Sequence, residues 1–221
     1  MEEIKIKMGR KDCLFGALAG LVIGLLFSPI LKAIRPELFS YKMALSIFLF
    51  FIIATPLGLF LAHLISRKIK VVWQIAKFGV TGVMNFLVDL GVLSILIFVF
   101  QNYFYIEAKT SLLNLGFVIL TCYSIYKATS FIVANINSYF WNKYWTFEKK
   151  SEGKTGQEFT QFFIVSLIGF VINVLVASYV FKSISFPGMT PEQWGMVGAA
   201  AGSIMGLIWN FLGYKFIVFK K

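Results

Sequence analysis

The sequence predicts an all-α integral membrane protein that crosses the bilayer with about six helices. Of its 221 residues, 58% are hydrophobic and 14% are charged, and the mean hydropathy is +0.79. A soluble domain is nearer half apolar and a quarter charged. The apolar excess falls in runs of roughly 20 residues, the length that a helix needs to cross a bilayer. Helix packing within lipid is therefore expected to set the fold.

Each of six apolar segments is expected to form one transmembrane helix. Five are uninterrupted runs, at residues 13–31, 43–66, 78–100, 159–181 and 194–214. The sixth, at residues 121–141, is the second part of a longer apolar stretch and contains Lys127. The first part of that stretch, residues 112–120, is too short for another crossing, so we expect it to lie in or near the membrane interface.

The net charge of +11 would suit a nucleic-acid-binding protein, but the distribution of the charges indicates membrane topology instead. With the N-terminus inside, fifteen lysines and arginines fall in the terminal segments and inner loops. The outer loops carry five, which are Lys32, Arg35, Lys42, Lys109 and Lys182. This asymmetry predicts a multi-pass protein of the cell membrane with both termini in the cytoplasm. Its basic inner rim should attract anionic membrane lipids, and no nucleic acid is expected as a partner.

A boundary near residue 70 is expected to divide the chain into two domains. Residues 1–70 form an N-terminal two-helix transmembrane hairpin, in which no polar residue suggests a function. Residues 71–221 form a four-helix transmembrane domain made of two tandem helical hairpins. Each of these hairpins is a helix, an outer loop, a helix and a basic-aromatic tail.

Small residues at four-residue spacing mark the first and the last span. They are Gly16, Gly20 and Gly24, then Gly198, Gly202 and Gly206. Such faces allow two helices to approach closely. Close packing explains each face by itself, but two faces exceed what one compact bundle needs. We therefore expect a homo-oligomer, which Gly20→Leu or Gly202→Leu should weaken.

The two hairpins of residues 71–221 are related by an internal repeat. Its register aligns Lys77 with Gln161, Asn85 with Gly169, Asp89 with Asn173, Ser138 with Asn210 and Lys143 with Lys215. Both halves enter the membrane from the same side, so the repeat is parallel. Duplicated membrane units often place a substrate path where the repeats meet. Simple duplication of a packing unit is the alternative.

A polar stripe runs along the first helix of this repeat. Lys77, Thr81, Asn85 and Asp89 are four residues apart and share one slowly rotating helix face. Asp89 lies about 17 Å beyond residue 78, near the bilayer midplane, where a charge is costly unless it is paired or neutralised. It is therefore a functional candidate, with a hydrogen-bonded structural carboxyl as the alternative.

A second polar face ends at the predicted inner boundary of the 121–141 span. Asn135, Ser138 and Asn142 share it. Lys143, Tyr144 and Trp145 follow, so that a cation, an amide and interfacial aromatics meet at headgroup depth. Together with Lys77 they are candidates for binding a lipid phosphate. Hydrogen bonding between helices is the alternative for the polar groups.

Two other polar residues, Lys127 and His63, have plainer interpretations. Lys127 is expected to snorkel to the outer surface, although it could instead neutralise Asp89. His63 is expected to be an interfacial histidine rather than a metal ligand. The chain shows no catalytic motif and no metal-ligand spacing, so we expect neither an enzyme nor a cofactor.

Several motifs resemble those of the GtrA-like family of small membrane proteins. They are Lys77-Phe78, Gly82-x-x-Asn85-x-x-x-Asp89, the stretch 134–147 with its Asn-Lys-Tyr-Trp-Thr-Phe end, Gln161-Phe162-Phe163, and Asn210-Phe211 with residues 215–219. The resemblance covers residues 71–221. The chain departs from the family pattern in its additional N-terminal hairpin and in an extended outer segment at residues 101–122. In the second half, Tyr214 replaces Asn142, which puts a second equivalent phosphate site in doubt.

The resemblance implies a role in cell-surface polysaccharide synthesis or glycosylation. It favours flippase-type translocation, or other handling, of polyprenyl-phosphate-linked sugars. The first alternative is a membrane scaffold or anchor for a partner glycosyltransferase. The second alternative is a small cation-coupled transporter that uses Asp89. An extended polar path would include Asn173 and Asn210 of the second half.

Overall fold

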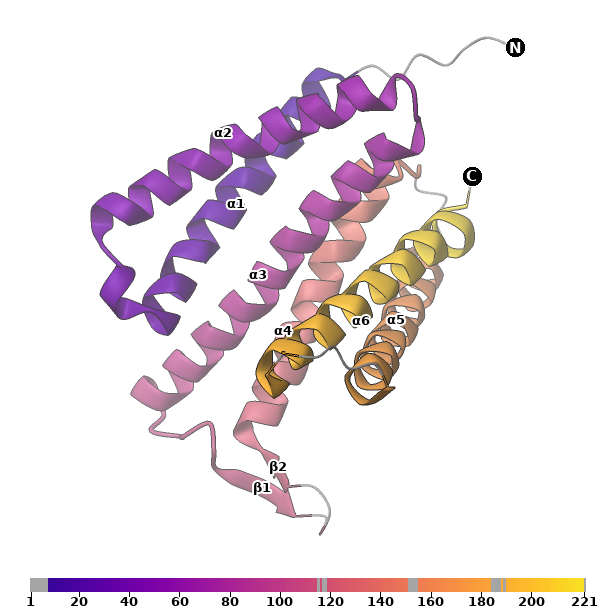
Figure 1. Ribbon diagram of the computed structural model, residues 1–221. Helices are drawn as coiled ribbons and strands as arrows, with labels where there is room; N and C mark the ends of the chain where they lie inside the picture. The colour runs from indigo at the N-terminus through magenta and orange to yellow at the C-terminus, as the bar shows by residue number, and fades with distance from the viewer. Residues whose placement is uncertain are drawn as a thin grey trace. The chain divides into compact units, whose positions relative to one another are not determined.

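A computed structural model describes residues 8–114, 116, 119–150, 155–183, 188 and 190–220. The chain is an all-α integral membrane protein with six long helices (Figure 1). The helices are α1 (Arg10–Ile34), α2 (Tyr41–Ser66), α3 (Val71–Tyr103), α4 (Cys122–Trp141), α5 (Thr155–Ser183) and α6 (Pro191–Gly213). Among the described residues, α1, α2, α3, α5 and α6 are long and apolar enough to span a membrane. In α4, Lys127 and six serine, threonine and asparagine residues lower the hydropathy, although its 20 residues reach about 30 Å.

Local sequence signals explain where several helices begin. The backbone N–H of Gly9 donates to Asp12 Oδ2 at 3.0 Å before α1, and the Met43 N–H donates to Ser40 Oγ at 3.1 Å before α2. Both contacts satisfy N–H groups that the first turn of a helix leaves without partners. The interiors are rich in Leu, Ile and Phe, because a helix in lipid must bond its whole backbone internally.

The helices form two compact units, residues 1–146 and 147–221. In the first unit, α1 and α2 form a hairpin that packs on α3, and α4 lies beside α3 (Figure 1). In the second unit, α5 and α6 form a hairpin. The two compact units divide after residue 146 and not near residue 70, because α1 and α2 pack on α3. The boundary between the domains at 1–70 and 71–221 stays a prediction about the sequence.

Short elements join or end the long helices. Residues Pro36–Leu38 form a 3₁₀ turn, η1, between α1 and α2. Strands β1 (Ser111–Asn114) and β2 (Ile119–Thr121) form an antiparallel hairpin before α4. The sequence predicted no strand here, because strands so short carry little periodicity. The interfacial location predicted for residues 112–120 stays a prediction, and residues 115, 117 and 118 lie outside the described residues.

Two π-helical turns extend the last helix of each half of the repeat. They are η2 (Asn142–Thr146), which follows α4, and η3 (Tyr214–Val218), which follows α6. The register that aligns Lys143 with Lys215 also aligns these two turns residue for residue. π-Turns inside helices are rare and often occur at functional sites.

Both glycine faces pack within the chain. Gly16, Gly20 and Gly24 of α1 lie against α2, and Gly198, Gly202 and Gly206 of α6 lie against α5. Close approach of the two helices in each hairpin therefore accounts for both faces. The inference that they lie at an interface between copies was wrong, and the homo-oligomer stays a prediction without that support.

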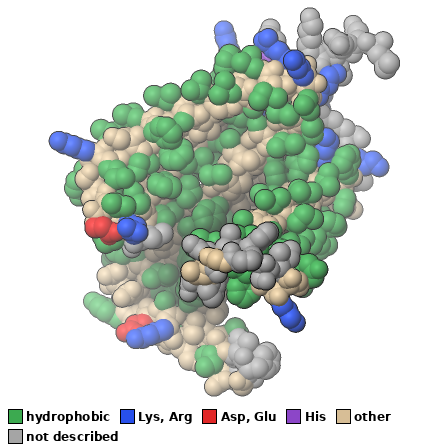
Figure 2. Space-filling view, viewed as in Figure 1, with side chains coloured by type: hydrophobic (Ala, Val, Ile, Leu, Met, Phe, Trp, Pro, Cys, Tyr) green, Lys and Arg blue, Asp and Glu red, His purple; other side chains and the backbone are tan. Residues whose placement is uncertain are grey.

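Hydrophobic side chains cover most of the face drawn in Figure 2, with lysines and arginines at its margins. Large apolar side chains on every long helix are exposed, among them Phe50 at 62% and Leu175 at 64%. Such a surface is stable in lipid and is a hazard in water. The protein is therefore a multi-pass membrane protein.

The predicted cytoplasmic location of both termini is open to a direct test. In a variant that lacks Cys13 and Cys122, single cysteines at Lys109 and Gly188 should react with a membrane-impermeant thiol reagent added to sealed cells. A cysteine at Lys150 should react only after permeabilisation, since the basic loops are expected inside. Outside labelling at residue 150 would contradict the topology. Four of the inner lysines, Lys5, Lys7, Lys154 and Lys221, lie outside the described residues.

Candidate functional site

The polar stripe of α3 faces α4 within the first unit. The Asn137 Nδ2 group of α4 donates to Asn85 Oδ1 at 3.4 Å, which links the two helices near the middle of the stripe. Thr81 is fully buried, and its hydroxyl has no hydrogen-bond partner among the described residues. The stripe predicted from four-residue spacing is therefore a helix–helix contact with an unsatisfied hydroxyl beside its basic end.

Asp89 closes the deep end of the stripe in an ion pair with Lys127 of α4. The Ser130 hydroxyl lies 2.6 Å from Asp89 Oδ1 and 3.0 Å from the Lys127 carbonyl oxygen. The prediction that Lys127 snorkels outward was wrong, and its alternative, pairing with Asp89, was correct. Pairing prevails because each charge deep in a span would otherwise lack a counter-ion.

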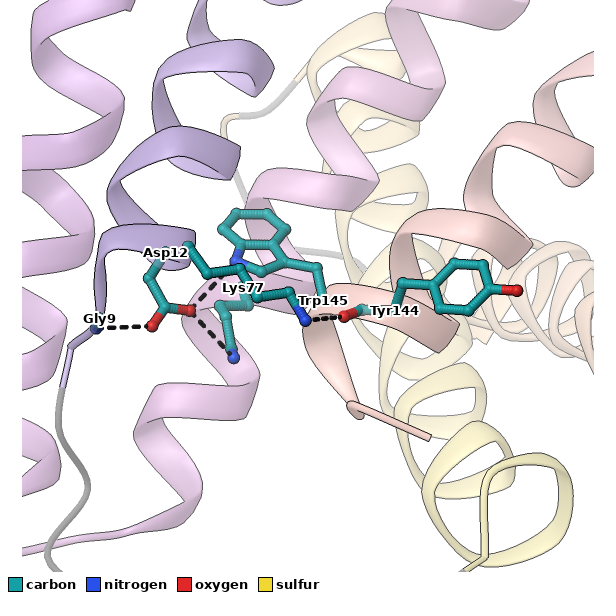
Figure 3. Close-up of polar contacts among 6 residues, drawn as sticks. Gly9, Asp12, Lys77, Tyr144 and Trp145 are labelled. Atoms are coloured by element: carbon teal, nitrogen blue, oxygen red, sulfur yellow. Dashed lines mark hydrogen bonds and ion pairs between the residues drawn. The ribbon is translucent and has the colours of Figure 1, made fainter. Parts of the chain in front are cut away.

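At the other end of the stripe, Lys77 joins a buried cluster around Asp12 of α1 (Figure 3). The Lys77 Nζ lies 3.4 Å from Asp12 Oδ1, and the Trp145 indole N–H donates to the same oxygen at 3.2 Å. The other carboxylate oxygen accepts the Gly9 N–H. Lys77 is 1% exposed and Asp12 is 7% exposed. Groups from α1, α3 and η2 thus meet at one carboxylate.

Aromatic packing and a second lysine hold this cluster together. The Phe15 ring of α1 stacks on Trp145 with centroids 5.8 Å apart. The Lys77 ammonium also lies 5.1 Å from the centre of the Trp73 ring, a cation–π contact. Lys11 Nζ donates to the Tyr144 carbonyl at 2.7 Å. α1 is therefore attached to η2 by two polar contacts and a stacked ring.

Asp12 is the residue that the sequence analysis missed, because it expected no functional polar group in the N-terminal hairpin. The structure places a buried carboxylate there, and a function for it stays a proposal. The available signal was one carboxylate placed directly after Arg10 and Lys11, at the start of an apolar span. Its partner Lys77 is 65 residues away, so no spacing rule connects the two.

The structure brings only part of the predicted phosphate site together. Lys77 and Trp145 meet, whereas Asn142 turns to its own helix and donates to the Ser138 carbonyl at 2.8 Å. Lys143 is fully buried and donates to the Tyr139 hydroxyl at 3.0 Å. Its ammonium also faces the ring of Tyr144, 5.9 Å from the centroid. The Lys143 ammonium is therefore sheltered by tyrosines.

Oxygen atoms near Lys143 remain without hydrogen bonds among the described residues. They are the Asn142 Oδ1 and Thr146 Oγ1 atoms of η2, both on side chains that are 1% exposed. A buried polar atom without a partner is costly and calls for an explanation. A ligand that supplies hydroxyl groups, such as a sugar, would satisfy the Asn142 acceptor.

The remaining stripe residues serve packing. Asn135 donates to the Phe131 carbonyl of its own helix at 2.9 Å. In the second unit, Asn210 lies against Gly169, and the Asn173 carbonyl lies against Gly202. In the repeat register, Gly169 aligns with Asn85. The Asn210 amide packs against Gly169 in the second half, whereas Asn85 accepts a hydrogen bond from the Asn137 amide in the first half. The structure shows no continuous polar row in the described second half.

Residues 77–219 match the family of GtrA/DPMS transmembrane domains. The chain belongs to this family. The resemblance inferred from the motifs is thus confirmed, and the matched GtrA/DPMS domain begins at Lys77 itself. Helices α1 and α2, with Asp12, precede it. No curated protein and no solved structure shows significant similarity to the chain.

Membership in the GtrA/DPMS family associates the chain with lipid-linked sugars and membrane lipids. Within the described residues there is no group of three His, Cys, Asp or Glu side chains that would hold a metal ion. The chemistry present is that of lysines, amides and hydroxyls between helices. Lysines, amides and hydroxyls are chemically suited to contacts with a phosphate or a sugar.

Proposed function

We propose that this protein translocates polyprenyl-phosphate-linked sugars across the membrane, or handles them within it, for cell-surface polysaccharide synthesis or glycosylation. The observation that carries the proposal is the polar contact between α3 and α4. It runs from Lys77 through Thr81 and the Asn85–Asn137 pair to Asp89. Over the twelve residue steps from Lys77 to Asp89 it extends about 18 Å into a span that is otherwise apolar. Polar groups so deep in a membrane are rare and commonly mark a substrate pathway.

In this proposal the lipid phosphate binds at the basic end of the stripe. Lys143 supplies the main charge, Asn142 and Lys77 assist, and Tyr144 and Trp145 border the headgroup. A lysine binds phosphate as a point charge with three donors. Because the Lys143 ammonium rests on the Tyr139 hydroxyl, the lipid must replace that contact. The unsatisfied Asn142 Oδ1 atom supports a role in holding a sugar hydroxyl.

Lys143→Gln should weaken binding of polyprenyl phosphate by about ten- to a hundredfold, because a hydrogen bond to a charged group contributes about 1.5–3 kcal/mol. Glutamine can still bond to Tyr139, so the fold should be retained. Lys143→Arg should keep part of the affinity. Binding is measured in nanodiscs of neutral lipid with the purified protein.

The control is Lys68→Gln, which removes one cation from the exposed turn between α2 and α3. It should bind normally. If Lys143→Gln is folded and binds as tightly as wild type, the assignment fails. General attraction to the basic rim would then account for lipid binding.

The test of transport is a vesicle that contains this protein alone and a labelled polyprenyl-phosphate sugar. Movement of the label between leaflets supports translocation. One observation favours the scaffold alternative. Asp12 and Asp89 already have lysine partners within the chain. This alternative expects a glycosyltransferase to co-purify and Asp89→Asn to be harmless. In either case we propose a non-enzymatic role.

A further inference from the structure

The Asp12 carboxylate lies where donors from three segments converge. The Lys77 ammonium and the Trp145 indole N–H belong to the GtrA/DPMS domain, whereas Asp12 and the Gly9 N–H precede it. A cation beside a neutral N–H donor is a suitable pair of groups for one phosphate oxygen. The two groups are held rigidly, since Trp145 is fully buried and Lys77 rests on Trp73.

The two oxygens of Asp12 are held differently. Oδ2 accepts the Gly9 N–H at 3.0 Å, a local contact at the start of α1. Oδ1 faces Lys77 at 3.4 Å and Trp145 at 3.2 Å. Charge-assisted N–H···O contacts are usually about 2.7–2.9 Å long. The carboxylate is thus loosely held by the GtrA/DPMS domain, and it would keep its local partner if it left.

We infer that Lys77 and Trp145 form an anion site for the lipid phosphate, in which Asp12 is an internal ligand that the phosphate displaces. The inference rests on the proposed function and extends it, because it makes the N-terminal hairpin a competitor of the substrate. On entry, the phosphate takes the Lys77 and Trp145 donors, and Asp12 retains the Gly9 N–H. Lys11, which bonds to the Tyr144 carbonyl next to Trp145, is the nearest additional cation on α1.

This arrangement explains why a lysine of the family domain is buried against a carboxylate from outside that domain. A buried lysine needs an anion. Asp12 is such an anion while no lipid is bound, and its contact helps to position Lys77. The same contact lowers the apparent affinity for phosphate, because phosphate binds only during the fraction of time in which Asp12 has left the site.

The test compares full-length wild type with Asp12→Asn and with Asp12→Asn/Lys77→Gln. Binding of a short-chain polyprenyl phosphate is measured in nanodiscs of neutral lipid, with inorganic phosphate in a parallel series. If Asp12 holds the site nine-tenths of the time, Asp12→Asn should lower the apparent Kd about tenfold. The gain should disappear in the double variant. A gain for the lipid alone identifies a headgroup site, and a gain for both ligands identifies a general phosphate site.

Two controls separate displacement from other effects. Glu107→Gln changes the net charge equally at an exposed ion pair and should leave the Kd unchanged. Asp12→Ser keeps an oxygen for the Gly9 N–H and serves as the second variant if asparagine reduces the folded yield. If neither variant folds, the carboxylate is indispensable to the fold and the inference is overturned.

The outcomes also separate this inference from the proposed function. The inference of a displaced carboxylate is overturned if folded Asp12→Asn binds phosphate no more tightly than wild type. It is also overturned if the gain in affinity persists in Asp12→Asn/Lys77→Gln. Both outcomes hold even if wild type moves lipid in vesicles. Conversely, a Lys77-dependent gain in a protein that moves no lipid supports the anion site and contradicts translocation.

Discussion

Gly20→Ala should destabilise the α1–α2 hairpin by about 3 kcal/mol, because overpacking at a rigid contact costs this much when the backbone has to move. A Cβ at residue 20 would overlap the carbonyl oxygen of Phe51 in α2. No side-chain rotation relieves the clash, since the backbone fixes the position of the Cβ and the oxygen belongs to the backbone of α2. Unfolding by denaturant in mild detergent measures the loss, and a cross-link between α1 and α2 should form less readily.

The matched control lies in the same hairpin. Gly58 of α2 has no heavy atom within 4 Å of the position that a Cβ would take. Gly58→Ala should therefore be neutral or stabilise the helix by up to about 1 kcal/mol. If Gly20→Ala is as stable as Gly58→Ala and only an oligomer is lost, the glycine face belongs to an interface between copies instead.

Asp89→Asn should slow lipid transport at least tenfold, while phosphate binding at the Lys77 end is spared. The change leaves Lys127 without its counter-ion deep in the membrane, and breaking a buried ion pair costs about 3–5 kcal/mol. The cost here should be smaller, about 2 kcal/mol, because the Lys127 side chain is 41% exposed and can extend toward the interface. Transport in vesicles and unfolding in detergent are measured on the same preparation.

Asp89→Asn/Lys127→Met separates stability from function. Removing both charges should restore most of the stability, because no unpaired charge remains in the membrane. Transport should stay slow if the charges act on the headgroup. Wild-type transport by the double variant would make the pair a structural link, and dependence of transport on an ion gradient would favour the cation-coupled alternative.

The positions of the six helices could be predicted from the sequence because each apolar run has to satisfy the length of a bilayer crossing. The run at 43–66, for example, lies within α2 (Tyr41–Ser66), and 121–141 nearly coincides with α4. Where the structure extends further, as in α3 to Tyr103, the helix continues through Gln101 and Asn102 beyond the apolar run. Hydropathy gives the apolar limits, whereas local caps give the true ends.

The partners of the polar groups could be predicted less well. The stripe of α3 followed from its four-residue period, but the period does not say which helix it faces. Lys127 had two plausible outcomes, and packing of α4 on α3 decided between them. Asp12 and Lys77 meet only because α1 packs on α3, a tertiary contact that leaves no periodic signal. The orientation of polar groups between helices thus depends on pairings that one sequence does not encode locally.

The paired π-turns set the register of the tails that follow them. Each adds one residue to a helical turn at the same repeat position, η2 in one half and η3 in the other. An insertion of this kind rotates every later side chain by about 100°. Deleting one residue from either turn should then restore an ordinary helical register and, in the first half, swing the indole of residue 145 away from α1.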